Sequence, residues 1–501
     1  MEKTLGYTEF YAERPKSNRF NVRQVAFVLG VLVLVEAGLF ALCAGISLLY
    51  RESEYTCFLQ AMAVNAVIGG GLMVAGKRQK TSMNRRDGYT LVALAWVCFT
   101  ILGMLPFCFS GQIASVTDAF FETMSGFTTT GATVFNHVET LPHGLLFWRS
   151  LTQWIGGLGI VLFTVTVLPW LGNNNRQLFL AEPTGVAQGK THIRPATMAK
   201  YLWIVYIGLT MTETLLLALG GMNLFDSVCH SLTTTSTGGF STKQESIAYW
   251  NSPYIEYVIS GFMILSGINF SLYFIAAKGH LRNVLKDEEL RWFLISIGIL
   301  TIIITAALFI TRYESLEVAF RKALFQVATS HTTCGFATDD YNLWPPFTWM
   351  LLIFAMICGG CTGSSGGGIK SLRLLVIARS IRNQFKQMLH PRAVLPVRIN
   401  GETISAQTTV QVYTFFVSYL LCIFIGWALL MCFGVGMTEA MSTVVSAIGN
   451  VGPGLGTYGP SYSWGALPDG AKWVLSILMF IGRMEIFGIL LLFYRRFWKE
   501  D

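Results

Sequence analysis

The sequence predicts an all-α polytopic membrane protein in which a helix, a re-entrant loop and a second helix form a unit that occurs four times. Its 501 residues are 53% hydrophobic and 13% charged, a composition outside the usual range of soluble proteins. Apolar segments of membrane-spanning length recur along the whole chain. Four shorter and more polar segments lie between paired spans, and their similarity to one another predicts the repeat.

About ten spanning helices are expected, because the hydrocarbon core of a bilayer needs roughly 20 apolar residues per crossing. The first apolar segment lacks a small-residue cleavage site and is followed directly by another span. We therefore expect it to be an anchor rather than a removed signal peptide. The expected spans are 25–50, 56–76, 89–110, 144–170, 201–219, 253–277, 292–312, 346–369, 412–435 and 473–494.

Basic residues occur in alternate loops rather than in one domain, so the net charge of +8 does not indicate a nucleic-acid partner. With ten spans, every basic group falls on one side of the membrane, and the positive-inside rule makes that side the cytoplasm. Both termini are therefore expected to be cytoplasmic. The groups lie at 14–23, 77–86, 176–194, 278–291, 379–392 and 495–499.

The ten cysteines lie mostly within apolar spans and show no spacing typical of a disulfide framework. Cys358 and Cys361 form a C-x-x-C motif. A structural zinc site needs four ligands, and neither a second cysteine pair nor a histidine lies near this motif. We therefore expect no metal cofactor, and no other cofactor, in this chain.

Four segments between the paired spans are too short and too polar to cross the membrane, which makes them candidates for re-entrant loops. Each begins with acidic and hydroxyl residues that favour a helix start, and each ends in a polar stretch followed by a glycine. The glycines Gly131, Gly238, Gly335 and Gly452 recur at intervals of about 100 residues, as a repeated unit requires. The segments are 117–133, 225–242, 316–338 and 438–457.

These loops predict an ion path. Non-helical backbone at membrane depth is tolerated only inside protein or beside water, and a dehydrated cation needs oxygens that replace its hydration shell. Rings of backbone carbonyls supply such oxygens, and glycine allows the positive φ that turns them inward. Simple extracellular turns are the alternative, which the occurrence of four loops in register disfavours. The expected cation ligands are Thr129, Thr130, Gly131, Ser236, Thr237, Gly238, Thr333, Cys334, Gly335, Asn450, Val451 and Gly452.

The segment 358–371, CGGCTGSSGGGIKS, interrupts the second helix of the third unit with six glycines. Each glycine costs about 1 kcal/mol relative to alanine in a helix, so a broken helix with an intramembrane loop is expected. A phosphate-binding loop is the alternative interpretation. That motif requires a glycine where Ile369 stands, and no strand precedes it.

Arg483 lies midway along the last expected span, where a charge costs at least about 2.5 kcal/mol and normally faces a cavity or a partner. A structural ion pair is the alternative. Glu485 is a poor partner for such a pair, because residues two apart point to different faces of a helix. Glu36 and Glu213 also lie within spans, and we expect structural or interfacial roles for them.

Several motifs resemble the Trk/Ktr/HKT superfamily of potassium and sodium transporters, and most closely its bacterial TrkH-type subunits. The resemblance covers nearly the whole chain. It implies four membrane-pore-membrane repeats around one pore, in a homodimer, at 88–197, 198–290, 291–405 and 406–501, with an extra N-terminal helix pair at 1–87. The most specific motifs are FETMSGFTTTGAT (121–133), FWRSLTQWIGGLGI (147–160), TSTGGFST (235–242), GGCTGSSGGGIKSLR (359–373), GPGLG (452–456) and GRMEIFGILLL (482–492).

The resemblance implies potassium uptake across the bacterial inner membrane, with K⁺ as the transported ion. It also implies a cytoplasmic ring of nucleotide-binding, TrkA-like regulatory subunits, and a pore-facing Arg483 that acts as a cation barrier. Glycine at position 131, where sodium-preferring relatives have serine, favours potassium. The expected gate consists of Gly359, Gly360, Thr362, Gly363, Ser364, Ser365, Gly366, Gly367, Gly368 and Lys370.

Selectivity is expected to be looser than in a potassium channel, because Ala132, Gly239 and Phe336 follow the first three glycines in place of a T-V-G-Y-G continuation. A poorly selective K⁺/Na⁺ channel, or a symporter that uses Na⁺ or H⁺, is therefore the alternative. An intramembrane enzyme is not expected, since no H-E-x-x-H or G-x-S-x-G motif occurs. A scaffold without transport would leave the four similar loops unexplained.

Overall fold

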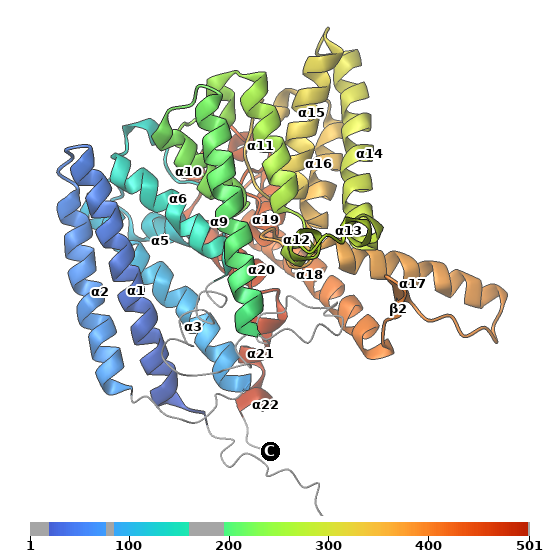
Figure 1. The fold of residues 1–501 in the computed structure, drawn as a ribbon, viewed down its shortest axis with the longest axis horizontal. Coiled ribbons are helices and arrows are strands. Elements are labelled where there is room, and N and C mark those ends of the chain that lie inside the picture. The colour runs from blue at the N-terminus through green and yellow to red at the C-terminus, as the bar shows by residue number, and fades with distance from the viewer. Residues whose placement is uncertain (1–19, 77–84, 160–194, 499–501) are drawn as a thin grey trace, which may run out of the picture.

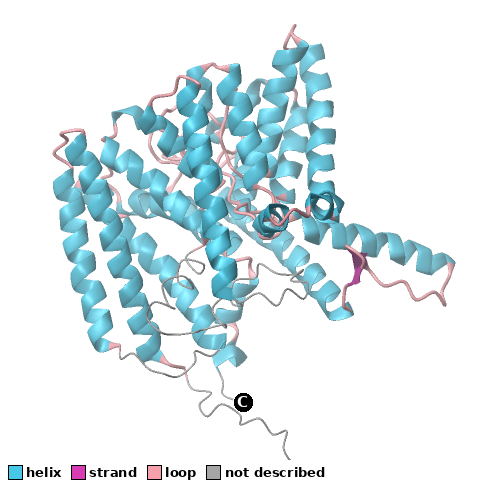
Figure 2. Ribbon diagram, in the orientation of Figure 1, coloured by secondary structure: helices cyan, strands magenta, loops and turns pink. Residues whose placement is uncertain are grey.

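A computed structural model describes residues 20–76, 85–159 and 195–498. The described residues are almost entirely helical, as Figure 2 shows, and the all-helical class predicted from the sequence is confirmed. One short antiparallel hairpin, which the sequence did not predict, joins β1 (Arg398–Ile399) to β2 (Glu402–Thr403). Asn400 and Gly401 form its turn at φ values of 53° and 82°, as a two-residue hairpin turn requires.

The N-terminal helix pair consists of α1 (Val22–Leu49) and α2 (Tyr55–Ala75), which lie side by side at one edge of the molecule in Figure 1. Their backbones approach closely at Gly30 and Gly69. A Cβ atom added at Gly30 would lie 2.7 Å from the Gly69 carbonyl oxygen, so this contact needs glycine. Glu36 accepts a hydrogen bond of 3.1 Å from Asn65 between the same helices.

Four helical units follow this pair, and each contains a first helix, a short pore helix and a second helix. The first unit comprises α3 (Arg85–Gly103), α4 (Leu105–Phe109), α5 (Val116–Phe127) and α6 (His143–Leu158). The second comprises α9 (Pro195–Leu219), α10 (Leu224–Thr235), α11 (Pro253–Ser266), α12 (Phe270–Ala277) and α13 (Leu281–Lys286). The third comprises α14 (Glu288–Thr311), α15 (Leu316–His331), α16 (Pro346–Cys358) and α17 (Ser371–Leu389). The fourth comprises α18 (Ala406–Cys432), α19 (Met437–Gly449), α20 (Asp469–Arg483), α21 (Phe487–Phe493) and α22 (Arg495–Trp498).

The pore helices α5, α10, α15 and α19 and the second helices α6, α11, α16 and α20 form a closed ring. Each pore helix contacts the second helix of its own unit and that of the preceding unit, and α5 closes the ring against α20. The first helices α3, α9, α14 and α18 each pack against the pore helix of their own unit. This arrangement places the ends of the four pore helices around one axis.

The pore helices begin close to where the acidic and hydroxyl residues predicted. Ser115 caps α5 by accepting a hydrogen bond from the Asp118 amide, and Asn223 caps α10 by accepting one from the Asp226 amide. Such caps satisfy amide groups that would otherwise lack partners at a helix start.

The second helices differ from the straight spans that hydropathy predicted. Among the described residues, six helices are long and apolar enough to cross a membrane, or eight if each bent pair counts as one span. The chain bends by 92° between α11 and α12 and by 113° between α20 and α21, while α16 ends after 13 residues. The expected spans at 253–277 and 473–494 are therefore bent pairs of helices rather than single helices, and the span at 346–369 is broken after Cys358, where the glycines predict a break. The part of the expected span 144–170 beyond residue 159 lies outside the described residues.

Two local features explain the bends. Asn269 caps α12 with its side chain, which accepts a hydrogen bond of 2.9 Å from the Ser271 amide. Glu485 and Ile486 have positive φ values of 51° and 57°, which a continuous helix does not allow. Both helices of each bent pair are largely apolar, so hydropathy averaged over the whole segment does not reveal the bend.

Candidate functional site

All four pore helices end in the same backbone turn. A residue with positive φ follows the helix, and the next amide donates a hydrogen bond to the carbonyl five residues earlier. The positive-φ residues are Thr129, Thr237, Thr333 and Asn450, with φ values of 54°, 52°, 61° and 55°. The amides that follow belong to Thr130, Gly238, Cys334 and Val451, with hydrogen bonds of 2.9, 2.8, 2.8 and 2.9 Å. The four loops therefore share one geometry despite different sequences.

The glycine of each loop lies two residues after the positive-φ residue. The glycines in this position are Gly131, Gly239, Gly335 and Gly452, with φ values of 83°, 78°, 94° and 111°. The structure thus corrects the second loop, where the sequence predicts Gly238 as the equivalent glycine and Ser236 as the first residue of the set. Gly238 instead corresponds to Thr130. In the sequence, the adjacent Gly238 and Gly239 leave the register of this loop open. In the structure, the positive φ of Thr237 determines it.

Each of these glycines packs against a carbonyl oxygen of the next loop around the axis. A Cβ atom added at Gly131 would lie 2.1 Å from the Gly238 oxygen, and one added at Gly239 would lie 2.1 Å from the Cys334 oxygen. A Cβ atom added at Gly335 would lie 1.9 Å from the Val451 oxygen, and one added at Gly452 would lie 2.6 Å from the Thr130 oxygen. Loop one therefore contacts loop two, loop two contacts loop three, loop three contacts loop four, and loop four contacts loop one. They therefore close a ring that has room only for glycine.

The second helices of the first and fourth units pass the pore helices at similarly close range. A Cβ atom added at Gly156 in α6 would lie 1.8 Å from the Phe127 oxygen, and one at Gly482 in α20 would lie 2.0 Å from the Ile448 oxygen. Each of these oxygens belongs to the last turn of the pore helix in the same unit. The next residue is a glycine in α6 but Arg483 in α20, so the two units differ directly below the ring.

Gln153 of α6, which the sequence analysis did not single out, supports the second loop. Its side-chain amide donates a hydrogen bond of 2.6 Å to the Gly238 carbonyl and accepts one of 3.0 Å from the Phe240 amide. In the fourth loop, Asn450 donates to the Thr130 hydroxyl and to the Met479 carbonyl, at 3.1 and 2.9 Å. A glutamine inside an apolar span is a signal that could have identified the first contact from the sequence.

A polar cavity opens beside the ring glycines Gly131, Gly239, Gly335 and Gly452, and Arg149, which belongs to a buried ion pair, lies in its wall. Arg149 bonds to Glu122 at 2.8 Å, and both side chains are at most 2% exposed. Glu122 also accepts hydrogen bonds from Thr133 and from the Val134 amide, while Arg149 donates to the Ser241 carbonyl at 3.1 Å. The pair therefore joins the segments that leave the first and second loops.

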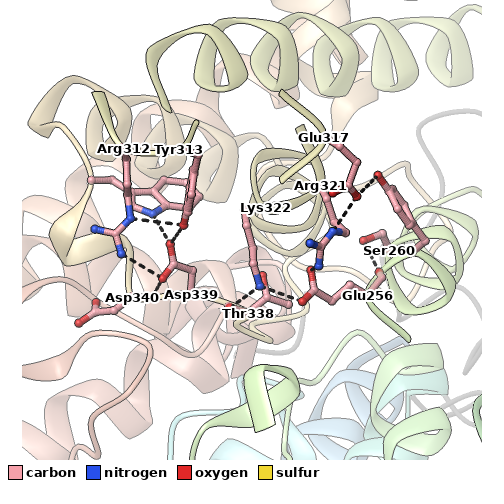
Figure 3. A network of polar contacts seen from close by, with 12 residues as sticks. Glu256, Ser260, Arg312, Tyr313, Glu317, Arg321, Lys322, Thr338, Asp339 and Asp340 are labelled. Atoms are coloured by element: carbon pink, nitrogen blue, oxygen red, sulfur yellow. Dashed lines mark hydrogen bonds and ion pairs between the residues drawn. The ribbon is translucent and has the colours of Figure 1, made fainter. Parts of the chain in front are cut away.

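A second buried network, shown in Figure 3, holds the segment that follows the third loop. Glu256 of α11 accepts hydrogen bonds from Arg321 at 2.9 Å and from Lys322 at 2.8 Å. Lys322 also donates to the Thr338 carbonyl at 2.9 Å. These charged residues were not singled out from the sequence, because their contacts join segments far apart in the chain.

Beside this network, Tyr313 donates a hydrogen bond to Asp339, which also pairs with Arg312 (Figure 3). Tyr313 lies in the loop that follows α14. Burial and the hydrogen bond with Asp339 raise the pKa of the Tyr313 hydroxyl to about 12. The hydroxyl therefore remains a donor at neutral pH.

Replacement of Glu256 with glutamine is expected to destabilise the protein by about 3 kcal/mol, because it leaves Lys322 without a carboxylate partner and Arg321 with only the exposed Glu317. Thermal unfolding of the protein in detergent measures the loss. Glu317→Gln is the matched control, since Glu317 pairs with the same arginine but is 53% exposed. The control is expected to cost about 0–1 kcal/mol. Equal destabilisation by the two variants would contradict the assignment of Glu256 as a buried anchor.

The glycine-rich segment after α16 crosses beneath the ends of three pore helices. Ser365 donates a hydrogen bond of 3.0 Å to the Thr235 carbonyl, and the Gly367 amide donates one of 2.7 Å to the Thr333 hydroxyl. A Cβ atom added at Gly367 would lie 2.2 Å from the Gly449 oxygen. The break in the helix occurs where the glycines predicted it, and the close contacts explain why glycine is needed there.

The end of the segment is held by the buried residue Lys370, which has a φ of 77° and whose ammonium group donates to the Gly366 carbonyl. Cys361 and Cys358 are buried free thiols. The segment is therefore a folded loop with its own internal contacts.

Arg483 contacts both the first unit and the glycine-rich segment. Its guanidinium donates hydrogen bonds to the Ser365 carbonyl at 2.8 Å and to the Gly157 carbonyl at 2.9 Å. Glu485 instead forms an ion pair with Arg373 of α17. Glu485 is therefore not the partner of Arg483, as the two-residue spacing predicts, and the arginine lies where α6, α20 and the glycine-rich segment meet.

Comparisons with known proteins agree with this architecture. The family model described as "TrkH: Cation transport protein" matches residues 55–499. The chain is 36% identical to the Trk system potassium uptake protein TrkH of Salmonella typhimurium, over 95% of this chain and 99% of that one. It is 34% identical to the Trk system potassium uptake protein TrkG of Escherichia coli, over 96% and 100%. The crystal structure of the potassium transporter TrkH from Vibrio parahaemolyticus superposes with a TM-score of 0.86 at 35% identity, over 95% and 99%.

Proposed function

Because the chain belongs to the TrkH family of cation transport proteins, we propose that it takes up potassium across a membrane through the ring formed by its four glycine loops. The closed set of glycine–carbonyl contacts carries this proposal. It brings one backbone oxygen from each of four loops to a common axis. Transport of this kind is not an enzymatic reaction, and it requires no cofactor in this chain.

The ring suits a dehydrated monovalent cation. Carbonyl oxygens of Thr130, Gly238, Cys334 and Val451 replace part of the hydration shell, and the neighbouring residues of each loop supply further oxygens. The pore helices α5, α10, α15 and α19 direct the negative ends of their dipoles toward the same axis. The proposed ligand sets are therefore residues 129–131, 237–239, 333–335 and 450–452.

With the corrected register of the second loop, the residue that follows the ring glycine there is Phe240 rather than Gly239. The residues that follow the four glycines are Ala132, Phe240, Phe336 and Pro453, so the second and third loops match each other more closely than the sequence alignment suggested. None continues as T-V-G-Y-G. We therefore propose a single strong site that favours potassium, with a poorly selective K⁺/Na⁺ channel or a symporter as the alternative.

The glycine-rich segment at 359–370 is the proposed gate. It lies under the ends of α10, α15 and α19. It forms hydrogen bonds with Thr235 and Thr333, which a small displacement can break, and it packs against the end of α19 at Gly449. Arg483 adds a positive charge at the same level and holds Ser365. Together they form a proposed barrier to cations that have passed the ring.

The proposed setting is the bacterial inner membrane, with both termini in the cytoplasm. The described parts of the basic groups support this orientation, because α13, α17 and α22 lie toward the same end of the helix bundle in Figure 1. A homodimer and a TrkA-like nucleotide-binding ring on the cytoplasmic side are the proposed protein partners. They follow from the family rather than from a contact in this chain.

Rubidium flux into proteoliposomes tests the proposal, with potassium, sodium and lithium as competitors. Potassium is expected to compete at least about tenfold better than sodium, a difference of about 1.4 kcal/mol in binding. Equal competition by sodium would remove the potassium assignment and favour the poorly selective alternative. Absence of flux from correctly folded protein would contradict transport itself.

A further inference from the structure

Three consecutive acidic residues at the start of α14 contact the glycine-rich segment on one side and the β1–β2 hairpin on the other. Asp287 caps the helix by accepting a hydrogen bond of 2.8 Å from the Leu290 amide. The next two residues, Glu288 and Glu289, point to different faces because successive residues in a helix diverge. The two faces therefore meet different parts of the third unit.

Glu289 holds the glycine-rich segment directly. Its carboxylate accepts a hydrogen bond of 2.5 Å from the Thr362 amide, and the two residues are 6% and 5% exposed. Two backbone hydrogen bonds fix the same part of the segment to the break between α11 and α12. The Cys361 amide donates to the Gly267 carbonyl at 2.9 Å, and the Phe270 amide donates to the Gly363 carbonyl at 3.1 Å. Glu289 supplies the side-chain contact in this set, and its loss leaves the buried Thr362 amide without that acceptor.

Glu288 holds the hairpin. Its carboxylate accepts hydrogen bonds from the Asn400 amide at 2.7 Å and from Arg379 of α17 at 2.9 Å. The Glu288 amide in turn donates to the Asn400 side chain at 2.9 Å, and the Asn400 side chain donates to Asp287 at 2.7 Å. The turn of the hairpin is thus fastened to the first residues of α14 by several hydrogen bonds at once.

We propose that Glu289 is a positioning residue that keeps the glycine-rich segment under the pore helices, and that the Asn400 turn sets its position through Glu288. The inference rests on the proposed function, because it requires the segment to control ion passage. A helix start moves as one body over adjacent residues. Displacement of the hairpin therefore shifts Glu289 and loosens its bond to the Thr362 amide.

The test compares Glu289→Ala, Glu289→Gln and the wild-type full chain in proteoliposomes. Glu289→Ala is expected to raise rubidium flux on the order of tenfold, since a buried hydrogen bond that holds the segment is lost. Glu289→Gln is expected to give a smaller rise, because its amide oxygen still accepts a hydrogen bond. The potassium-to-sodium ratio is expected to stay unchanged, which a general disturbance of the fold or of the ring would alter.

A second readout follows the segment itself. Cys361 is buried next to Thr362, so its modification by a thiol reagent, measured by the mass of its peptide, reports release of the segment. Modification is expected to be faster in Glu289→Ala than in the wild type, and Asn400→Ala is expected to change it in the same direction by less. Glu54→Ala is the matched control, because Glu54 stands at the start of α2 without a side-chain capping bond.

The outcomes separate the inference from the proposed function. Wild-type levels of flux and of Cys361 modification in Glu289→Ala, or a reduced flux, would overturn the positioning role. If Glu289→Ala does not fold, the same comparison with Glu289→Gln decides. If the wild type carries no rubidium, the proposed function fails, and Cys361 modification still tests whether Glu289 holds the segment. Unchanged modification in Asn400→Ala would overturn the part assigned to the hairpin.

Discussion

Replacement of Gly335 with alanine is expected to reduce rubidium uptake by at least about a hundredfold, although it adds only one methyl group. Gly335 has a φ of 94°, and an added Cβ atom would lie 1.9 Å from the Val451 carbonyl oxygen. Positive φ alone costs about 1–2 kcal/mol in an L-residue. The clash is with backbone, so no side chain can move aside to relieve it. The carbonyl that moves instead is one of the four in the ring.

Uptake by the variant in proteoliposomes, relative to wild type at equal protein, measures this effect. Gly298→Ala is the control, because a Cβ atom at Gly298 in α14 meets nothing within 4 Å. Wild-type elution on size exclusion in detergent establishes that the Gly335 variant has folded. Uptake above about a tenth of wild type would contradict a ring that has room only for glycine.

The same substitution at neighbouring glycines tests the register of the second loop. Gly239→Ala is expected to behave like Gly335→Ala, since its Cβ atom would lie 2.1 Å from the Cys334 oxygen at a φ of 78°. Gly238→Ala is expected to be milder, because its closest contact at 2.4 Å is with the Gln153 side chain, which can shift. A larger loss of rubidium uptake in Gly238→Ala than in Gly239→Ala would contradict the structural register and support Gly238 as the equivalent glycine.

The sequence was most informative where structure depends on local chemistry. Caps, apolar length and the spacing of glycines predicted α1, α2, the four pore helices and the break after Cys358. Apart from the recurrence of the loop glycines, each of these features depends on residues a few positions apart. The register of the second loop was wrong for the same reason, because Gly238 and Gly239 are locally equivalent until contacts with the neighbouring loops distinguish them.

The sequence was least informative about contacts between distant segments. Gln153 reaches Gly238 across 85 positions, Glu256 reaches Lys322 across 66, and Glu289 reaches Thr362 across 73. No periodicity or motif records such pairs. The bends after α11 and α20 were also missed, since apolar residues lie on both sides of each bend and hydropathy averages across it.

Removal of the charge at Arg483 is expected to raise cation flux by about tenfold or more. A unit charge near a transported cation contributes on the order of 2 kcal/mol of repulsion at the effective dielectric of a protein surface, and 1.4 kcal/mol corresponds to a factor of ten. The same substitution removes the hydrogen bond to the Ser365 carbonyl, so the glycine-rich segment also loses one of its supports. Both effects act in the same direction in Arg483→Ala.

Arg483→Lys separates these two causes. Lysine keeps the charge, but it cannot reproduce the planar fork with which arginine joins Ser365 to Gly157. If repulsion dominates, rubidium flux through Arg483→Lys stays near wild type while Arg483→Ala rises. If support of the segment dominates, both variants rise. Arg282→Ala in the exposed helix α13 is the control for loss of a positive charge elsewhere. Wild-type flux through Arg483→Ala would show that this arginine neither repels the ion nor holds the segment in place.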